Sequence, residues 1–209
     1  DEQDSIIRSY AQMALINSKS TDEEIEELIA KSENWDSFGQ EAAAVALGRV
    51  DSHRTREVLR ELRNSRYPKV SLAALASEVG LGLEDSKKRL IEIINEGKGL
   101  DPSVAAASLR RMPRDVSAAL TRELISCCKL SSDVGTRLLE AWSNIGAVPK
   151  DIHNWGLTND NPDIRLQSIW LVGYTGAIEY LEEVTVSLDD EDSGIRGMAA
   201  WSIIRLLQE

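Results

Sequence analysis

The chain repeats one helical pattern about every 31 residues along its length. An anchor residue recurs seven times, at intervals of 30 to 34 residues. The residue four places after the anchor is Ala or Ser in six copies, and the residue eight places after it is apolar in six. Positions 0, +4 and +8 share one face of a helix, so the pattern predicts seven helices that each bury one stripe. The anchors are Ile7, Gly39, Val70, Val104, Val134, Ile164 and Ile195.

Each of these helices also has a start signal three residues before its anchor. In six copies this residue is Asp, Asn or Ser, whose side-chain oxygen accepts from the unpaired NH groups of a first helical turn. The exception is Tyr67, in a weak copy where Glu78 occupies the apolar +8 position. The six predicted caps are Asp4, Asp36, Asp101, Ser131, Asn161 and Asp192.

A second set of amphipathic and more highly charged segments lies between the anchor helices. No run of alternating β-branched residues and no Asn-Gly hairpin signal interrupts them. We therefore predict an all-α chain of about six helix pairs preceded by one N-terminal helix. The second segments are predicted at 22–33, 51–64, 84–96, 114–127, 149–158 and 176–188.

The repeat resembles a known family. The pattern Asp-x-x-Ile-Arg-x-x-Ala-Ala-x-x-Ile-Ile at 192–204, echoed at 161–173 and 101–113, is similar to HEAT repeats of the short-period subtype found in phycobiliprotein lyases. This resemblance implies a right-handed α-α superhelix, an armadillo-like solenoid, formed by residues 1–209 as a single array. It also implies that Arg8, Arg165 and Arg196 pair with carboxylates of adjacent repeats.

Charge narrows the possible partners. The chain carries 24 basic and 35 acidic residues, a net charge of −11, which opposes nonspecific binding to nucleic acid or anionic lipid. Residues 49–69 are the exception, with a net charge of +4. Nucleic-acid contact there is a minor alternative, because the same side chains are ordinary helix-face neighbours of acids. This secondary basic patch comprises Arg54, Arg56, Arg60 and Arg63.

No apolar run is long enough to span a membrane, and the sequence does not start with the basic segment and apolar core that mark a signal peptide. The cytoplasm is therefore the default compartment. The first residue is Asp rather than Met, so we expect a fragment or a processed part of a longer chain. In one alternative, a presequence has already been removed from it.

Residues with catalytic or metal-binding chemistry are few. Cys127 and Cys128 are adjacent, with Cα atoms about 3.8 Å apart, which is less than a disulfide normally spans, and we expect both to be buried in a helix. His53 and His153 are expected at the surface, where their helices begin. They lack the adjacent Glu of the iron-binding His-Glu pairs in HEAT-type deoxyhypusine hydroxylases. With no phosphate loop or nucleophile motif either, we expect no cofactor, no metal and no enzymatic activity.

The remaining candidate site is the stripe at positions +3, +6 and +10 of each anchor helix, opposite the buried stripe. The HEAT resemblance places this stripe on the concave face of the array. In the last units it holds Arg, Trp, Tyr and Met, which are enriched at protein interfaces. Alternatively, Trp170 and Trp201 pack beneath a neighbouring helix. The candidate partner-binding residues are Arg110, Arg114, Arg137, Gln167, Trp170, Tyr174, Met198, Trp201 and Arg205.

These observations favour a non-catalytic scaffold that holds a protein or peptide partner, whose identity the sequence does not give. One alternative is a bilin-handling protein similar to phycobilin lyases, in which the stripe arginines contact the propionates. A weaker alternative is a HEAT-like DNA glycosylase or nucleic-acid binder, which the acidic ends of the chain disfavour. A homo-oligomer is compatible with all three.

Overall fold

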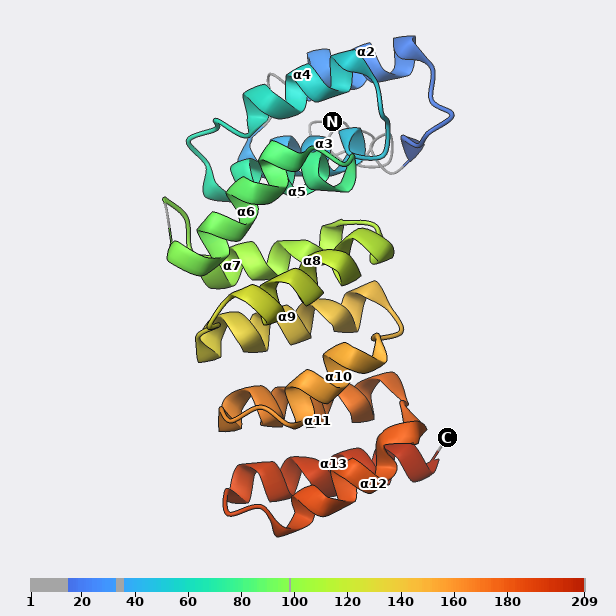
Figure 1. Ribbon diagram of the computed structural model, residues 1–209. Helices are drawn as coiled ribbons and strands as arrows, with labels where there is room; N and C mark the ends of the chain where they lie inside the picture. Colours follow the sequence, from blue (N-terminus) through green and yellow to red (C-terminus); the bar gives the residue numbers. More distant parts are fainter. Residues whose placement is uncertain (1–14, 33–35, 98, 209) are drawn as a thin grey trace. The chain divides into compact units, whose positions relative to one another are not determined.

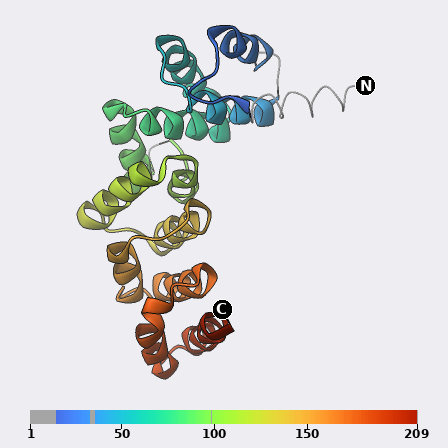
Figure 2. The same ribbon diagram turned by 90° about the vertical axis from the view of Figure 1, so that its right-hand side faces the viewer.

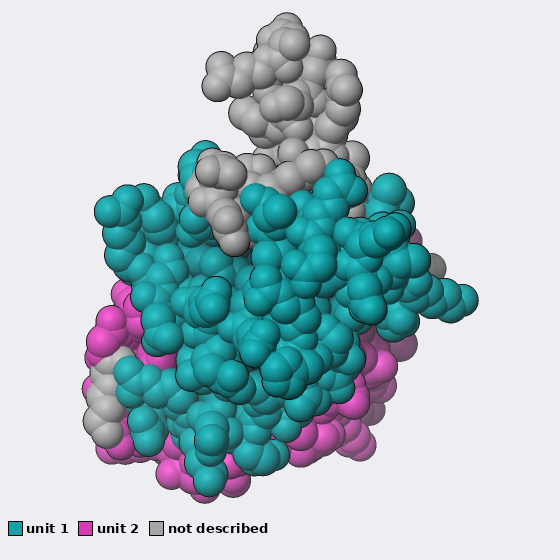
Figure 3. Space-filling view, turned by 90° about the horizontal axis from the view of Figure 1, so that it is seen from above, with its two compact units in different colours: residues 1–92 teal, residues 93–209 magenta. Residues whose placement is uncertain are grey.

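The computed structural model describes residues 15–32, 36–97 and 99–208, and within them the chain is all-helical, with no strand. Backbone contacts group the chain into two compact units, residues 1–92 and 93–209, each described here by itself (Figures 1 and 3). Among the described residues, no helix has the length and apolar character that crossing a membrane requires.

Within residues 15–32 and 36–92, the first unit contains four complete helices and the start of a fifth. Helix α3 packs against α5, α2 packs against α3, and α4 contacts both α3 and α5. Their shared core is built from Ile, Leu, Val and Ala side chains, including Ile25, Leu47 and Leu59. The helices are α2 (Asp22–Ser32), α3 (Ser37–Leu47), α4 (His53–Leu62), α5 (Pro68–Gly80) and α6 (Glu84–Glu96), of which α6 extends into the second unit.

The second unit is arranged in two layers of helices (Figure 2). One layer is formed by α7, α9, α11 and α13, each packed against the next, and the other contains α8, α10 and α12. The elements are α7 (Pro102–Ala107), η1 (Ser108–Arg111), α8 (Arg114–Cys127), α9 (Ser132–Ile145), α10 (Lys150–Leu157), α11 (Pro162–Thr175), η2 (Ile178–Tyr180), α12 (Leu181–Val186), η3 (Ser187–Asp189) and α13 (Ser193–Gln208).

The predicted caps begin the anchor helices. Asp36 accepts from the backbone NH of Gly39 at 2.9 Å, and Tyr67 makes no side-chain cap, as its sequence suggested. Asp4 and Arg8 lie outside the described residues. The four other caps, each bonded to a backbone NH of its first turn, are Asp101, Ser131, Asn161 and Asp192.

Most of the predicted apolar stripe is buried, but Val104 is 44% exposed. Helix α7 is only six residues long and passes into the 3₁₀ turn η1 before Pro113. Proline cannot continue a helix from the preceding turn, yet the +4 and +8 residues of this copy, Ser108 and Met112, are 1% and 6% exposed, so only the anchor position leaves the core. The prediction that Val104 is a core anchor is therefore wrong.

Adjacent anchor helices approach closely through a serine and a glycine. The hydroxyl of Ser77 in α5 donates to the carbonyl of Ala44 in α3 at 2.9 Å, and Ser202 in α13 donates to Ile169 in α11 at 2.8 Å. Both serines occupy position +7 and both acceptors position +5. A Cβ on Gly173 would lie 2.8 Å from the Cα of Ser202. Equal positions therefore lie nearly side by side where the helices meet. A Cβ on Gly194, at −1 of α13, would lie 3.4 Å from Leu166, at +2 of α11, so α11 and α13 run parallel.

Candidate partner-binding surface

The parallel packing of α9, α11 and α13 sets the geometry of the candidate surface. Gly135 at position +1 of α9 lies against Ile164 at position 0 of α11. Ile169 at +5 of α11 is bonded to Ser202 at +7 of α13. Positions +3, +6 and +10 of the three helices therefore form rows across one layer of the second unit.

Aromatic side chains occupy the +6 and +10 rows. Trp170 is half-buried against the core cluster of α9 and α11, and it stacks on Tyr174 with ring centroids 4.8 Å apart and planes at 24°. Tyr174 is 52% exposed and Trp201 is 39% exposed. The two tryptophans thus differ. Trp170 packs partly into the core, whereas a large part of Trp201 faces solvent.

A polar pocket of about 520 Å³ lies beside these rows, near the starts of α7, α9 and α11. Two predicted site residues, Arg137 and Gln167, line it. Arg137 forms an ion pair with Glu140 of its own helix. The wall also contains Asp133 and Asp163, neither of which was identified from the sequence, so carboxylates outnumber the single arginine. The pocket is therefore suited to a cationic group.

The other predicted site residues are not brought together in this pocket. Arg110 is exposed in η1, and Arg114 donates twice to the carbonyl of Ala147, at 3.1 and 2.8 Å. Met198 is half-buried against the core of the last helix pairs, and Arg205 is exposed on α13. Arg114 therefore ties the start of α8 to the loop after α9, a structural contact that sequence spacing did not indicate.

The secondary basic patch is largely neutralised. Arg54 pairs with Glu26 at 2.9 Å, and Arg56 makes a bidentate contact with Asp51 at 2.7 and 2.9 Å. Exposed pairs of this kind contribute little stability, but each cation is occupied by a carboxylate. Arg60 is exposed. The segment with a net charge of +4 therefore does not present a continuous basic surface.

The fourth arginine of the patch belongs to a buried polar cluster. Arg63 donates to Glu78 Oε2 at 3.0 Å, and the Ser86 hydroxyl donates to the same oxygen at 2.8 Å. Glu78 is completely buried, and its Oε1 has no hydrogen-bond partner. This contact explains the irregular copy at 67–80, because the acid at the apolar position is satisfied by an arginine from α4's C-terminus and a serine from α6.

The prediction that both histidines lie at the surface is wrong for His153. His53 is exposed, as expected, but His153 is 2% exposed, with its ring centroid 4.6 Å from that of Tyr180. Its Nδ1 is buried without a partner. Burial lowers the pKa of His153 to about 4, and the nearby carboxylate of Glu179 only partly opposes this. The prediction was wrong because α10 begins at Lys150, which places His153 one turn inside a short helix, where its ring packs against Tyr180 of η2.

The prediction that the two adjacent cysteines are buried is also wrong. Cys127 is exposed and Cys128 is partly exposed, because α8 ends at this pair rather than continuing past it. Both thiols are free. Burial, together with the neighbouring Cys127, raises the pKa of Cys128 to about 11. No group of three or more His, Cys, Asp or Glu side chains suited to a metal ion occurs in residues 15–32, 36–97 and 99–208.

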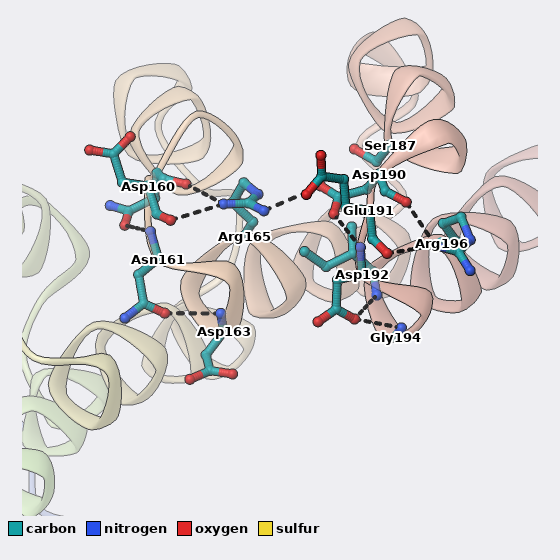
Figure 4. A network of polar contacts seen from close by, with 12 residues as sticks. Asp160, Asn161, Asp163, Arg165, Ser187, Asp190, Glu191, Asp192, Gly194 and Arg196 are labelled. Carbon is teal, nitrogen blue, oxygen red and sulfur yellow. Dashed lines mark hydrogen bonds and ion pairs between the residues drawn. The ribbon is translucent and has the colours of Figure 1, made fainter.

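The repeated arginines hold loops and link neighbouring helix pairs (Figure 4). Arg165 donates to Asp190 at 3.3 Å, across to the loop before α13. A backbone hydrogen bond from Asp192, followed by the contact with Arg165, lowers the pKa of Asp190. Arg196 donates to the carbonyls of Asp190 and Glu191 in the loop that precedes its own helix. Arg165 thus makes the cross-repeat ion pair that was expected.

These features define an all-helical class but no family. The sequence matches no protein-family model, and a search of curated proteins finds no match. Among solved structures, an engineered protein is similar over 88% of this chain and 96% of its own, with 16% sequence identity and a TM-score of 0.40. That likeness is too low to support an argument about function.

Proposed function

We propose that the chain is a non-catalytic scaffold that holds a protein or peptide partner. In this proposal the helix pairs form a HEAT-like right-handed solenoid, and the rows at +3, +6 and +10 lie on its concave face. The observation that carries the proposal is the exposure of Tyr174 and Trp201 in rows across two adjacent parallel helices. Large aromatic side chains of these types are enriched at interface hot spots.

The pocket beside the aromatic rows suggests which chemistry the partner supplies. Asp133, Glu140 and Asp163 line it with only Arg137 to oppose them. A lysine or arginine side chain of the partner fits this wall, and the adjacent aromatic faces favour a cation as well. We therefore infer a basic partner segment, in keeping with the net charge of −11.

The same wall disfavours the bilin alternative. A tetrapyrrole carries two propionates, and three carboxylates would repel them where Arg137 was expected to attract them. Arg114 is bonded to the carbonyl of Ala147, and Arg110 does not line the pocket. The nucleic-acid alternative is disfavoured for a parallel reason, because three of the four arginines of the basic patch are paired with acids.

Site-directed photo-crosslinking tests the proposal. A photoreactive phenylalanine analogue would replace Trp201 or Tyr174, and the matched control would carry it at Val186, which is also exposed but lies on α12. Irradiation in native lysate should give the same crosslinked partner from positions 201 and 174, identified by mass spectrometry, and none from position 186. Trp201→Ala with unchanged thermal stability should then abolish capture of that partner. Equal crosslinking at all three positions, or full capture by Trp201→Ala, would overturn the proposal.

A further inference from the structure

The end of α8 places two thiols side by side at the surface. Helix α8 ends at Cys127, and Cys128 follows it with extended backbone. Cys127 is exposed, Cys128 is partly exposed, and their Sγ atoms lie 3.0 Å apart. The backbone NH of Cys128 donates to the carbonyl of Leu124 at 3.1 Å, which fixes the pair to the last turn of the helix. Both sulfurs can therefore reach one ligand atom from solvent.

The separation of the two sulfurs suits a shared ligand atom better than a direct bond. A disulfide needs sulfurs about 2.05 Å apart and Cα atoms at least about 4.4 Å apart, whereas neighbouring Cα atoms are about 3.8 Å apart. One atom bonded to both sulfurs at about 2.3 Å, the length of a zinc–thiolate bond, holds them roughly 3–4 Å apart. The 3.0 Å between Cys127 and Cys128 lies at the edge of that range, so chelation is favoured over a disulfide.

Two observations narrow the class of thiol-binding ligand. No third His, Cys, Asp or Glu completes a metal site with the pair in the described part of the chain, so the protein offers two bonds, fewer than most metal ions require. Burial, together with Cys127, raises the pKa of Cys128 to about 11, so a metal cation must displace a firmly held proton. A trivalent arsenic atom that already carries one organic group needs only two further bonds.

A pocket beside Cys128 has room for that organic group. It measures about 390 Å³ and lies between the loop after α8 and the loop before α11. Cys128 lines it, and the half-buried ring of Trp155 and the side chain of Ile164 supply an apolar wall. An aryl group is apolar and packs favourably against an indole ring. The pocket therefore favours an aryl substituent on the arsenic.

We propose that Cys127 and Cys128, with this pocket, form a binding site for a trivalent arsenical that carries one aryl group. An aryl arsenoxide condenses with the two thiols. Two As–S bonds form, the two S–H bonds and the As=O bond break, and both protons leave with the oxygen as one water. Arsenic stays trivalent, so the step needs neither oxidant nor reductant. The site shares no residue with the aromatic rows or the acidic pocket of the proposed function.

Titration of the reduced full chain with phenylarsine oxide tests the site. Intact-mass spectrometry should show one adduct, equal to the probe less one water, that survives excess glutathione and is removed by dithiothreitol. Cys127→Ser and Cys128→Ser should each weaken binding at least about tenfold, because the second As–S bond is then no longer intramolecular. A matched control with two separated thiols combines Cys128→Ser with Arg60→Cys, at an exposed position of α4, and should bind as weakly as the single variants.

Adjacent cysteines in an unfolded chain also chelate arsenic, so the decisive measurement compares the folded and unfolded states. A ligand that binds the folded state more tightly stabilises it. One equivalent of phenylarsine oxide should therefore raise the urea midpoint of the parent and leave that of Cys128→Ser unchanged. An unchanged or lowered midpoint for the parent would overturn the proposal. Tighter binding of cadmium ions, or of arsenite, which has no aryl group, would equally overturn it. Neither result depends on the crosslinking at position 201.

Discussion

At the scale of single residues, two glycines in neighbouring helices have opposite surroundings. A Cβ on Gly173 would lie 2.7 to 2.8 Å from Ser202, including its Cα, whereas a Cβ on Gly197 would meet nothing. Gly173→Ala should therefore destabilise the chain by about 1–3 kcal/mol through overpacking. Gly197→Ala is the matched control and should be neutral or stabilising by up to about 1 kcal/mol, because alanine favours the helix. Urea unfolding of both variants measures this, and equal effects would contradict the close approach of α11 and α13.

His153 should make stability depend on pH. Its folded pKa of about 4 lies below the ordinary value of 6.5, because burial disfavours the charged ring. The folded state therefore binds fewer protons than the unfolded state, and this contribution is complete above pH 6.5 and is lost as the pH falls toward 4. The loss amounts to about 3 kcal/mol across that window. His153→Phe should remove this part of the pH dependence.

Because carboxylates also titrate near pH 4, the quantity to compare is the difference in the free energy of unfolding between the parent and His153→Phe. Urea unfolding at several pH values measures it. Glu179 is the acid that acts on His153. Glu179→Gln keeps the histidine and should leave the slope between pH 6.5 and 5 in place. A parent and His153→Phe chain with parallel pH profiles would refute the buried, neutral histidine.

At the scale of elements, the joint between α4, α5 and α6 depends on one buried ion pair. Arg63→Ala would leave the fully buried carboxylate of Glu78 without its cation. Removing one partner of a buried pair costs about 3–5 kcal/mol. Adding Glu78→Leu should restore much of that loss, since the other copies place an apolar residue at this position. Arg60→Ala, on the exposed face of α4, should stay within about 0.5 kcal/mol. Thermal unfolding compares the four chains, and a loss below about 1 kcal/mol for Arg63→Ala would contradict the pairing.

Signals confined to one helix were predictable from the sequence. Helices α6 and α8 have the predicted bounds, and caps such as Asp101 lie where the pattern placed them, because capping involves only a few consecutive residues. Contacts across helices were not predictable in the same way. The partner of Glu78 was not identified, since Arg63 lies 15 residues away and nothing local marks it.

The candidate surface was predictable only in part, for a similar reason. Helical spacing placed Trp170, Tyr174 and Trp201 in one stripe, and two of them are substantially exposed. It did not indicate that Asp163 joins Arg137 in one pocket, because Asp163 lies on α11 and meets Arg137 only through the packing of α9 on α11. Asp133 precedes Arg137 by four residues on α9, so helical spacing could have identified it. Burial of His153 likewise involves Tyr180 of η2, which lies far along the chain from its own helix.

At the scale of the whole molecule, basic and acidic residues are concentrated in different segments of the chain. In the basic segment at 49–69, at least three of the seven basic side chains form ion pairs with acids of this chain, such as Arg54 with Glu26. Residues 177–209 keep eight acids against two bases, and most of these acids are exposed around α12 and the start of α13. In the proposed function this charge would attract a basic partner at long range, and the aromatic rows are the proposed short-range contact.

The two compact units should also differ in how they respond to a core mutation. Leu47 is fully buried in the cluster formed by α2–α5, and Leu47→Ala should destabilise that unit by about 2–5 kcal/mol. In an array stabilised mainly by neighbouring contacts, the loss stays local. Amide exchange should then accelerate in α3 and α5 and remain unchanged in α11 and α13, whose core contains none of the same residues. Val184→Ala in that second core is the reciprocal control and should accelerate exchange in α13 but not in α3. Uniform acceleration throughout the chain in either variant would show one cooperative unit and would contradict a nearest-neighbour array.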